Sequence, residues 1–231
     1  MRTEKFAVIG IGQFGKSIAL NLTQKGAEVM AIDMNYDRIE SISDEVAYAV
    51  TLNATDRKAL LSQDITRFDA VIVSIGNPLE QRLLCAALLL DLGVKHIVCR
   101  ASGRNEHFIL KKMGITDIIS PEQEVGMSVA KHLMNPSLVS YLDLADDYSI
   151  VEVIAPKQIC GLAYGKVSFR DKYKLSLITI KRDYSKNSTN QNTTNQHVLG
   201  VPDTKTIILP KDTLVLFGKN KDIEKFIIIN N

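Results

Sequence analysis

Three glycines near the start of the chain, Gly10, Gly12 and Gly15, have the spacing G-x-G-x-x-G. The first two let the backbone turn tightly and approach a phosphate closely, and the third lets the following helix pack against a strand. Asp33 ends the next apolar segment, where it can accept hydrogen bonds from ribose hydroxyls. Its charge would repel a 2′-phosphate, so the pattern predicts a nucleotide site that disfavours NADP. The alternative is that the glycines serve only a tight turn.

These residues need a β-α-β unit to position them, and residues 5–33 have its pattern. The segment KFAVIG is apolar, IGQFGKSIALNLTQKG has a helical apolar face, and AEVMAID is apolar again. The helix would direct its free N–H groups and the positive end of its dipole toward the ligand's phosphates. Strands and helices continue to alternate, with strands expected at 48–52, 70–75, 96–100 and 117–120 and helices at 36–42, 56–63, 78–92 and 105–113.

This alternation predicts an α/β fold, a Rossmann-like doubly wound parallel sheet, followed by a small α+β C-terminal domain. A further helix is expected at 121–134, and Asn135 and Pro136 end it. We therefore place the domains at 1–135 and 136–231. The second domain has short strand patterns at 149–154, 175–180 and 212–218 and a closing helix at 222–229, and the polar tract 185–196 is expected to be a loop.

The composition excludes several classes of protein. With 28 Lys and Arg against 26 Asp and Glu, the net charge of +2 is too balanced for a surface that binds a nucleic acid polymer. The longest apolar run, Leu83 to Leu90, is too short to span a bilayer, and no signal sequence precedes the first strand, so we expect a soluble cytosolic protein. Cys85, Cys99 and Cys160 are scattered and are expected to be buried reduced thiols.

The run from Leu83 to Leu90 also predicts a helix that is apolar on nearly all sides. One face of a sheet cannot cover such a helix, so we expect it to pack against another subunit. The alternative is a central helix enclosed by its own domain.

Residues for catalysis are not evident. The second domain offers one histidine, His197, next to the polar tract, and His96, His107 and His132 are expected to be surface or core-edge residues. The sequence contains neither a metal-ligand spacing nor a G-x-x-x-x-G-K-S/T loop. We therefore expect the protein not to be an enzyme, and its nucleotide to be sensed rather than consumed.

Six segments together resemble one family: FAVIGIGQFG, AEVMAID, LNATD, VIVSIG, SPE and VSFRDKYKLSLITIKR. They are similar to the RCK (KTN) regulatory subunits of Ktr and Trk potassium uptake systems, over essentially the whole chain. The resemblance implies dimers that form an octameric ring on the cytoplasmic face of an integral-membrane potassium pore subunit. It also implies that ATP favours the conducting state and ADP the inactive state.

The resemblance assigns the nucleotide site residue by residue, from the phosphates to the ribose, the adenine and the cleft. The residues are Gly10, Gly12, Gln13, Phe14, Gly15, Asp33, Asn53, Ala54, Thr55, Ile75, Gly76 and Arg100. Arg100 would face the phosphates with its planar fork. Family members commonly have a basic residue where this chain has Gln13, and neighbouring Lys16 is the candidate to replace that charge.

Two further ligands are implied by the same resemblance. Glu122 would help to hold a divalent or sodium cation near the phosphates across a dimer, and its alternative role is a partner for a helix dipole. In the second domain, Arg170, Ile178 and Pro202 would bind cyclic di-AMP, and the alternative for Arg170 is a solvated surface residue. Two other functions remain open from the glycine pattern: an NAD(H)-binding redox sensor and an NAD-dependent oxidoreductase.

Overall fold

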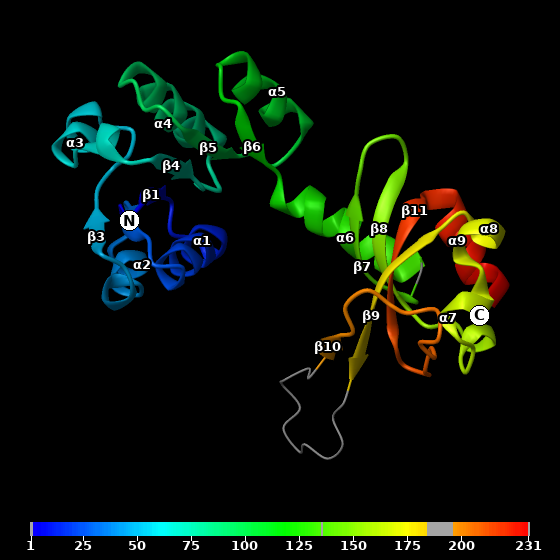
Figure 1. The fold of residues 1–231 in the computed structure, drawn as a ribbon. Coiled ribbons are helices and arrows are strands. Elements are labelled where there is room, and N and C mark those ends of the chain that lie inside the picture. Colours follow the sequence, from blue (N-terminus) through cyan, green and yellow to red (C-terminus); the bar gives the residue numbers. More distant parts are fainter. Residues whose placement is uncertain (1, 135, 184–195, 231) are drawn as a thin grey trace. The chain divides into compact units, whose positions relative to one another are not determined.

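The structure, a computed structural model, describes residues 2–134, 136–183 and 196–230 (Figure 1). The chain divides into two compact units, residues 1–126 and 127–231. The division lies inside the helix α6 (Pro121–Met134), whereas the boundary expected after residue 135 lies at the end of that helix. Within the described ranges, no helix combines the length and the apolar character needed to cross a membrane.

The first unit contains a parallel sheet of six strands in the order β3-β2-β1-β4-β5-β6. The strand order reverses next to β1, so the carboxyl ends of β1 and β4 flank the point where doubly wound sheets bind their ligands. The predicted Rossmann-like fold is thereby confirmed. The strands are β1 (Lys5–Ile9), β2 (Glu28–Asp33), β3 (Tyr48–Thr51), β4 (Ala70–Val73), β5 (Ile97–Arg100) and β6 (Asp117–Ile119).

Alternate residues of β1 enter different cores, because successive side chains of a strand point to opposite faces. Ala7 and Ile9 belong to one apolar cluster and Val8 belongs to another, so both faces of the sheet are covered. Asn35 and Asp56 cap their helices by accepting hydrogen bonds from backbone N–H groups. The helices are α1 (Gln13–Gln24), α2 (Tyr36–Glu40), α3 (Arg57–Ser62), α4 (Leu79–Asp91) and α5 (Arg104–Lys112), with 3₁₀ turns at Ser43–Glu45 and Ile65–Arg67.

The second unit contains an antiparallel sheet in the order β10-β9-β11-β8-β7. Its core includes a cluster of aromatic rings, in which Phe226 lies 5.5 Å from Phe169 and 5.0 Å from Tyr173 between ring centroids. Helices and strands together confirm the predicted α+β class. The elements are β7 (Leu138–Asp143), β8 (Tyr148–Ile154), β9 (Ser176–Asp183), β10 (Gln196–Val198), β11 (Thr213–Lys219), α7 (Tyr164–Val167), α8 (Phe169–Tyr173) and α9 (Asn220–Asn230), with a 3₁₀ turn at Lys157–Ile159.

Several of these elements were not expected from the sequence. Strand β7 has only partly buried and exposed residues, so it lacks the alternation that marks a half-buried strand. Helices α7 and α8 span four and five residues, too short for a helical period to show. The polar tract at 185–196 lies outside the described residues apart from Gln196, with which β10 begins.

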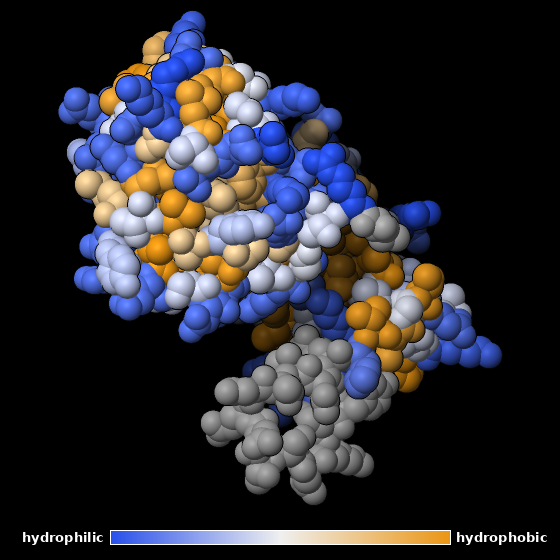
Figure 2. Space-filling view, turned by 90° about the vertical axis from the view of Figure 1, so that its left-hand side faces the viewer, coloured by the Kyte–Doolittle hydropathy of each residue, from blue (hydrophilic) through white to orange (hydrophobic). Residues whose placement is uncertain are grey.

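Helix α4 is buried on one side only. Cys85, Ala86 and Leu89 are fully buried in the first unit, whereas Leu84 is 46% exposed. An apolar surface depression is lined by Pro78, Leu79, Glu80, Leu83, Leu84, Ala87 and Met113. The alternative of a helix enclosed by its own unit is therefore wrong, and contact with another subunit stays a prediction. Figure 2 shows hydrophobic residues exposed between hydrophilic ones on the face that it displays.

Candidate functional site

The glycine loop follows β1 and leads into α1. Gly10 has φ +95°, and a Cβ on it would lie 2.7 Å from Ile75 N, so both the conformation and the space require glycine. A Cβ on Gly15 would lie 2.0 Å from Gly10 O, so helix α1 can approach the loop only because that atom is missing. The two positions therefore have the roles that the sequence predicted for a turn and a close helix contact.

The N-terminus of α1 is open to an anion. Gly12 is its N-cap residue. No side chain of the described residues makes a capping hydrogen bond there, and the first turn contains no acidic residue. Its N–H groups and the positive end of the helix dipole are therefore available for phosphate. Gln13 begins the helix but does not line the cavity described below.

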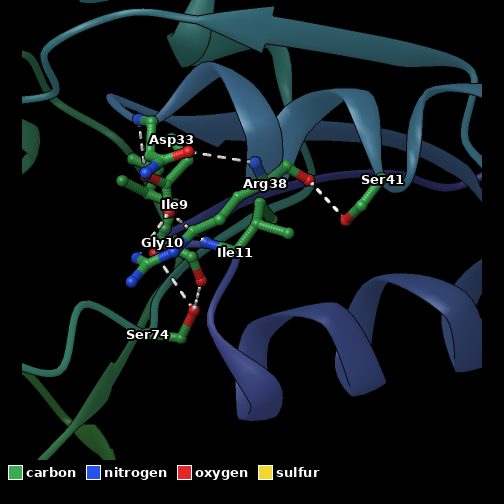
Figure 3. A network of polar contacts seen from close by, with 8 residues as sticks. Ile9, Gly10, Ile11, Asp33, Arg38, Ser41 and Ser74 are labelled. Atoms are coloured by element: carbon green, nitrogen blue, oxygen red, sulfur yellow. Dashed lines mark hydrogen bonds and ion pairs between the residues drawn. The ribbon is translucent and has the colours of Figure 1, made fainter.

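Asp33 is 5% exposed and holds the glycine loop in place (Figure 3). Its Oδ2 accepts a hydrogen bond of 2.7 Å from Ile11 N, and its Oδ1 accepts one of 2.9 Å from Asn35 N. Arg38 Nη1 lies 3.4 Å from Oδ2. Each carboxylate oxygen can accept two hydrogen bonds, so the ribose contact predicted for Asp33 would share the carboxylate with these backbone donors.

Ser74 connects the glycine loop to the neighbouring strand. Its Oγ donates to Gly10 O at 2.7 Å and lies 3.1 Å from Ile9 O, and Figure 3 shows these contacts at the end of β4. Ser74 N donates to Ile9 O at 2.8 Å. The loops after β1 and β4 are therefore fixed to each other. Nothing in the sequence pattern distinguishes this serine from one in an ordinary turn.

Arg100 lies at the carboxyl end of β5, on the other side of β1 from Asp33. Its Cζ is 5.8 Å from the centroid of the Phe14 ring, and its Nη2 donates to Glu122 Oε1. Its buried Nε has no hydrogen-bond partner among the described residues. A buried donor without a partner is unfavourable, so a phosphate oxygen brought by a ligand would satisfy it.

These residues enclose a cavity of about 300 Å³ at the switch point of the sheet. Its carboxylate side is formed by Asp33 and its cationic side by Arg100, so it suits a ligand that carries both hydroxyl donors and anionic oxygens. Ten of the residues predicted for the nucleotide line it: Gly10, Gly12, Phe14, Asp33, Asn53, Ala54, Thr55, Ile75, Gly76 and Arg100.

Sequence reasoning missed seven lining residues. The loop after β4 contributes Ser74 and Asn77. The sequence would have suggested them only if every residue that follows a strand were taken as a candidate for the site. The others are Ile9, Met34, Arg38, Leu52 and Gln81. Lys16, the candidate to replace a basic residue at position 13, does not line the cavity. Its Nζ donates to Ser41 O at 2.7 Å, so its charge is used at that turn.

Glu122 is 57% exposed and pairs with Arg100 within the chain. Across the described residues, no cluster of three or more His, Cys, Asp and Glu side chains could hold a metal ion. The cation expected near Glu122 therefore stays a prediction.

Burial raises the pKa of Cys85 and Cys99 to about 12, so both are neutral thiols at physiological pH.

In the second unit the residues predicted for cyclic di-AMP come from different elements. Arg170 is an exposed residue of α8, Ile178 is 40% exposed on β9, and Pro202 is partly buried after β10. None of the three lines either of two depressions among this unit's described residues, one beside Asp143 and Ser149 and one beside His132 and Tyr141, and their role as a ligand site remains a prediction.

Known proteins match the chain in sequence and in fold. A family model described as the TrkA-N domain matches residues 6–121, about half of the chain. The Ktr system potassium uptake protein A of Bacillus subtilis (strain 168) is 33% identical over 226 residues, which cover 98% of this chain and 96% of that relative. The predicted resemblance is thereby confirmed.

Two solved structures share the fold. The crystal structure of the GsuK RCK domain matches all of this chain with a TM-score of 0.64 at 15% identity, and the chain spans about half of its length, 48%. The crystal structure of GsuK bound to ADP matches 58% of this chain and 34% of its own with a TM-score of 0.50 at 25% identity. The chain therefore belongs to the TrkA-N (RCK) domain family, the family of the Ktr potassium uptake protein that it matches along nearly its whole length.

Proposed function

We propose that the chain is a cytoplasmic nucleotide-sensing subunit that gates a potassium uptake transporter. The observation that carries this proposal is the cavity at the switch point, with Asp33 on one side of β1 and Arg100 on the other. A carboxylate suits ribose hydroxyls, and a guanidinium beside an open helix N-terminus suits phosphates. The protein senses its nucleotide and is not an enzyme.

ATP and ADP are the proposed ligands. Support comes from the unpartnered Nε of Arg100 and from the ADP bound to GsuK, whose structure matches 58% of this chain. ATP and ADP can change the state of an assembly only if their affinities for its two states differ. The γ-phosphate is the group that distinguishes them, so we place the switch at the Arg100 side of the cavity, with a divalent or sodium cation held near Glu122.

The partner is an integral-membrane potassium pore subunit. The end-to-end match to a Ktr system potassium uptake protein supports this partner. We propose that dimers of the chain form an octameric ring at the inner face of the membrane. The exposed apolar side of α4 supports self-association, because monomeric proteins rarely leave such surfaces uncovered.

Calorimetric titration tests the nucleotide assignment. We expect ATP and ADP to bind more tightly than NAD, and Asp33→Ala to weaken all adenosine ligands together because the ribose contact is common to them. ATP and ADP binding no better than NAD would rule out this form of the proposal. Measuring the size of the protein in solution with and without ATP tests the ring, and a monomer under both conditions would contradict it.

An NAD(H)-binding redox sensor is the second candidate. The glycine loop with Asp33 favours it, since the same pattern binds dinucleotides, and Gln13 lacks the charge that family members commonly have there. Relative affinities for NADH and ATP separate the two. Turnover of NADH with a small carbonyl substrate would instead support an oxidoreductase.

Cyclic di-AMP inhibition through the second unit is the remaining part of the proposal. It depends on the similarity of Arg170, Ile178 and Pro202 to the family's ligand positions. We expect Arg170→Ala to weaken cyclic di-AMP binding while ATP binding is unchanged, because the two sites lie in different units. Equal cyclic di-AMP affinity in the wild type and the variant would remove this residue from the site.

A further inference from the structure

Arg82 of α4 is the largest fully buried side chain among the described residues, with 0% exposure. Burying a guanidinium is strongly unfavourable unless its charge is paired and its donors are bonded. The helix therefore carries this charge into the first unit at a cost that its contacts must offset. Those contacts lead directly to the cavity.

The guanidinium of Arg82 binds the loop between β4 and α4. Its Nη1 donates to Ile75 O at 2.6 Å and to Gly76 O at 2.7 Å. Both residues line the cavity. Hydrogen bonds from a charged donor are stronger than those between neutral groups, so this part of the cavity wall is held from behind by one side chain.

Glu106 of α5 completes the arrangement. Its Oε2 accepts from Arg82 Nη2 at 2.6 Å and also from Ser102 N at 2.6 Å. Ser102 lies two residues after Arg100, which ends β5. The pair therefore connects the cavity loop after β4 with the backbone that follows Arg100.

We propose that Arg82 and Glu106 are a positioning pair that fixes the phosphate side of the cavity, so that they determine the preference for adenine nucleotides over adenosine. This inference rests on the proposed nucleotide function. An ideal Cβ on Gly76 would lie 3.9 Å from Arg100 Nη1, which places the loop held by Arg82 beside the guanidinium proposed to bind the phosphates. Asp33 lies across β1, and neither member of the pair bonds to it.

A purely structural ion pair would have a different effect. Loss of packing would weaken the whole cavity, so that adenosine and ATP would lose affinity in the same proportion. Loss of positioning would weaken only ligands with phosphates. Arg82→Lys keeps the charge but removes the planar fork that reaches two carbonyls and a carboxylate together. Glu106→Gln keeps the shape and removes the charge.

Titration of the full chain with adenosine, ADP and ATP tests the proposal in the wild type and both variants. We expect affinity for ADP and ATP to fall about tenfold in each variant, and affinity for adenosine to change less than about twofold. Asp91→Asn is the matched control, because Asp91 also belongs to α4 and pairs with Arg57 at an exposed position outside the cavity. Its affinities should equal those of the wild type.

The outcomes separate this inference from the function on which it rests. Equal losses for adenosine and ATP, or no losses, would show that the pair does not position the phosphate side. A wild type that binds none of the three ligands would instead overturn the proposed function. If thermal unfolding shows that Arg82→Lys does not fold, Glu106→Gln decides the question alone.

Discussion

The Asp33 carboxylate that faces the cavity also accepts hydrogen bonds from the protein backbone. The backbone N–H groups of Ile11 and Asn35 donate to it, and both contacts are at least partly buried. Arg38 is also within 3.4 Å but is 56% exposed. A buried donor that loses its acceptor is costly, whereas an exposed ion pair contributes little, so the two residues of this contact should differ sharply in their effect on stability.

We expect Asp33→Ala to lower the free energy of unfolding by about 2 kcal/mol or more, because it leaves two backbone donors unsatisfied. Arg38→Ala should lower it by at most about 1 kcal/mol, because its partner keeps both backbone donors. Urea unfolding monitored by circular dichroism measures both values. Similar losses in the two variants would mean that the ion pair, and not the backbone contacts, is what Asp33 contributes.

Substitutions of Gly12 and Gly15 should also distinguish an effect on nucleotide binding from an effect on stability. Gly12→Ala has free space and a negative φ of −77°, so it should cost at most about 1 kcal/mol while placing a methyl group where phosphate approaches. Gly15→Ala forces a Cβ against Gly10 O and should cost about 3 kcal/mol or more. Thermal unfolding and ATP titration of both variants measure this; an intact ATP affinity in a folded Gly12→Ala protein would contradict the loop assignment.

Residue spacing predicted part of this site and could not predict the rest. The glycines and Asp33 follow from a local motif, because the turn and the strand end fix their positions. The residues after β3 were assigned by the family resemblance and not by spacing. Ser74 donates a hydrogen bond to Gly10, which lies far away in the sequence, and Arg82 donates to the carbonyl of Ile75 in a loop. An arginine directly before an apolar helical run looks like a surface residue until the chain is folded.

At the scale of elements, the sequence predicted long periodic segments well and predicted short segments, or segments without a periodic pattern, poorly. Every strand of the parallel sheet was expected, and the central strands β1, β2 and β4 have the apolar runs typical of buried parallel strands. Strand β7 was missed because its side chains do not alternate in burial. For α4 the apolar composition indicated correctly that its own unit covers only one side, but it did not show which residues stay exposed.

The exposed side of α4 leads to a prediction about assembly. Leu84 is 46% exposed there, so Leu84→Lys should leave the fold stable, while a charge in a buried interface should weaken self-association at least about tenfold. Sedimentation velocity over a range of protein concentrations measures it. Leu61→Lys on α3 is the matched control, since Leu61 is 48% exposed and lies outside the α4 depression. Unchanged association in Leu84→Lys would place the interface elsewhere.

At the scale of the whole molecule, the two units have separate apolar cores. Ile9 and Leu89 belong to a cluster of the first unit, and Leu214 and Phe226 belong to a cluster of the second. The cysteines are distributed between them: Cys85 and Cys99 lie in the first core, and Cys160 is partly buried in the second unit. Each unit therefore carries its own chemical reporter of opening.

This distribution predicts how nucleotide changes thiol labelling. Only the thiolate reacts, and burial raises the pKa of Cys85 and Cys99 to about 12, so at pH 8 both should react only after the first unit opens. A ligand bound to the closed form at about 100 times its Kd should slow their labelling about a hundredfold, by mass action. The reaction of Cys160 should keep its rate, because its unit has its own core. Mass spectrometry after alkylation for increasing times resolves the three sites, and the Asp33→Ala variant should lose the protection. Equal protection of Cys160 would mean that the two units open as one cooperative structure.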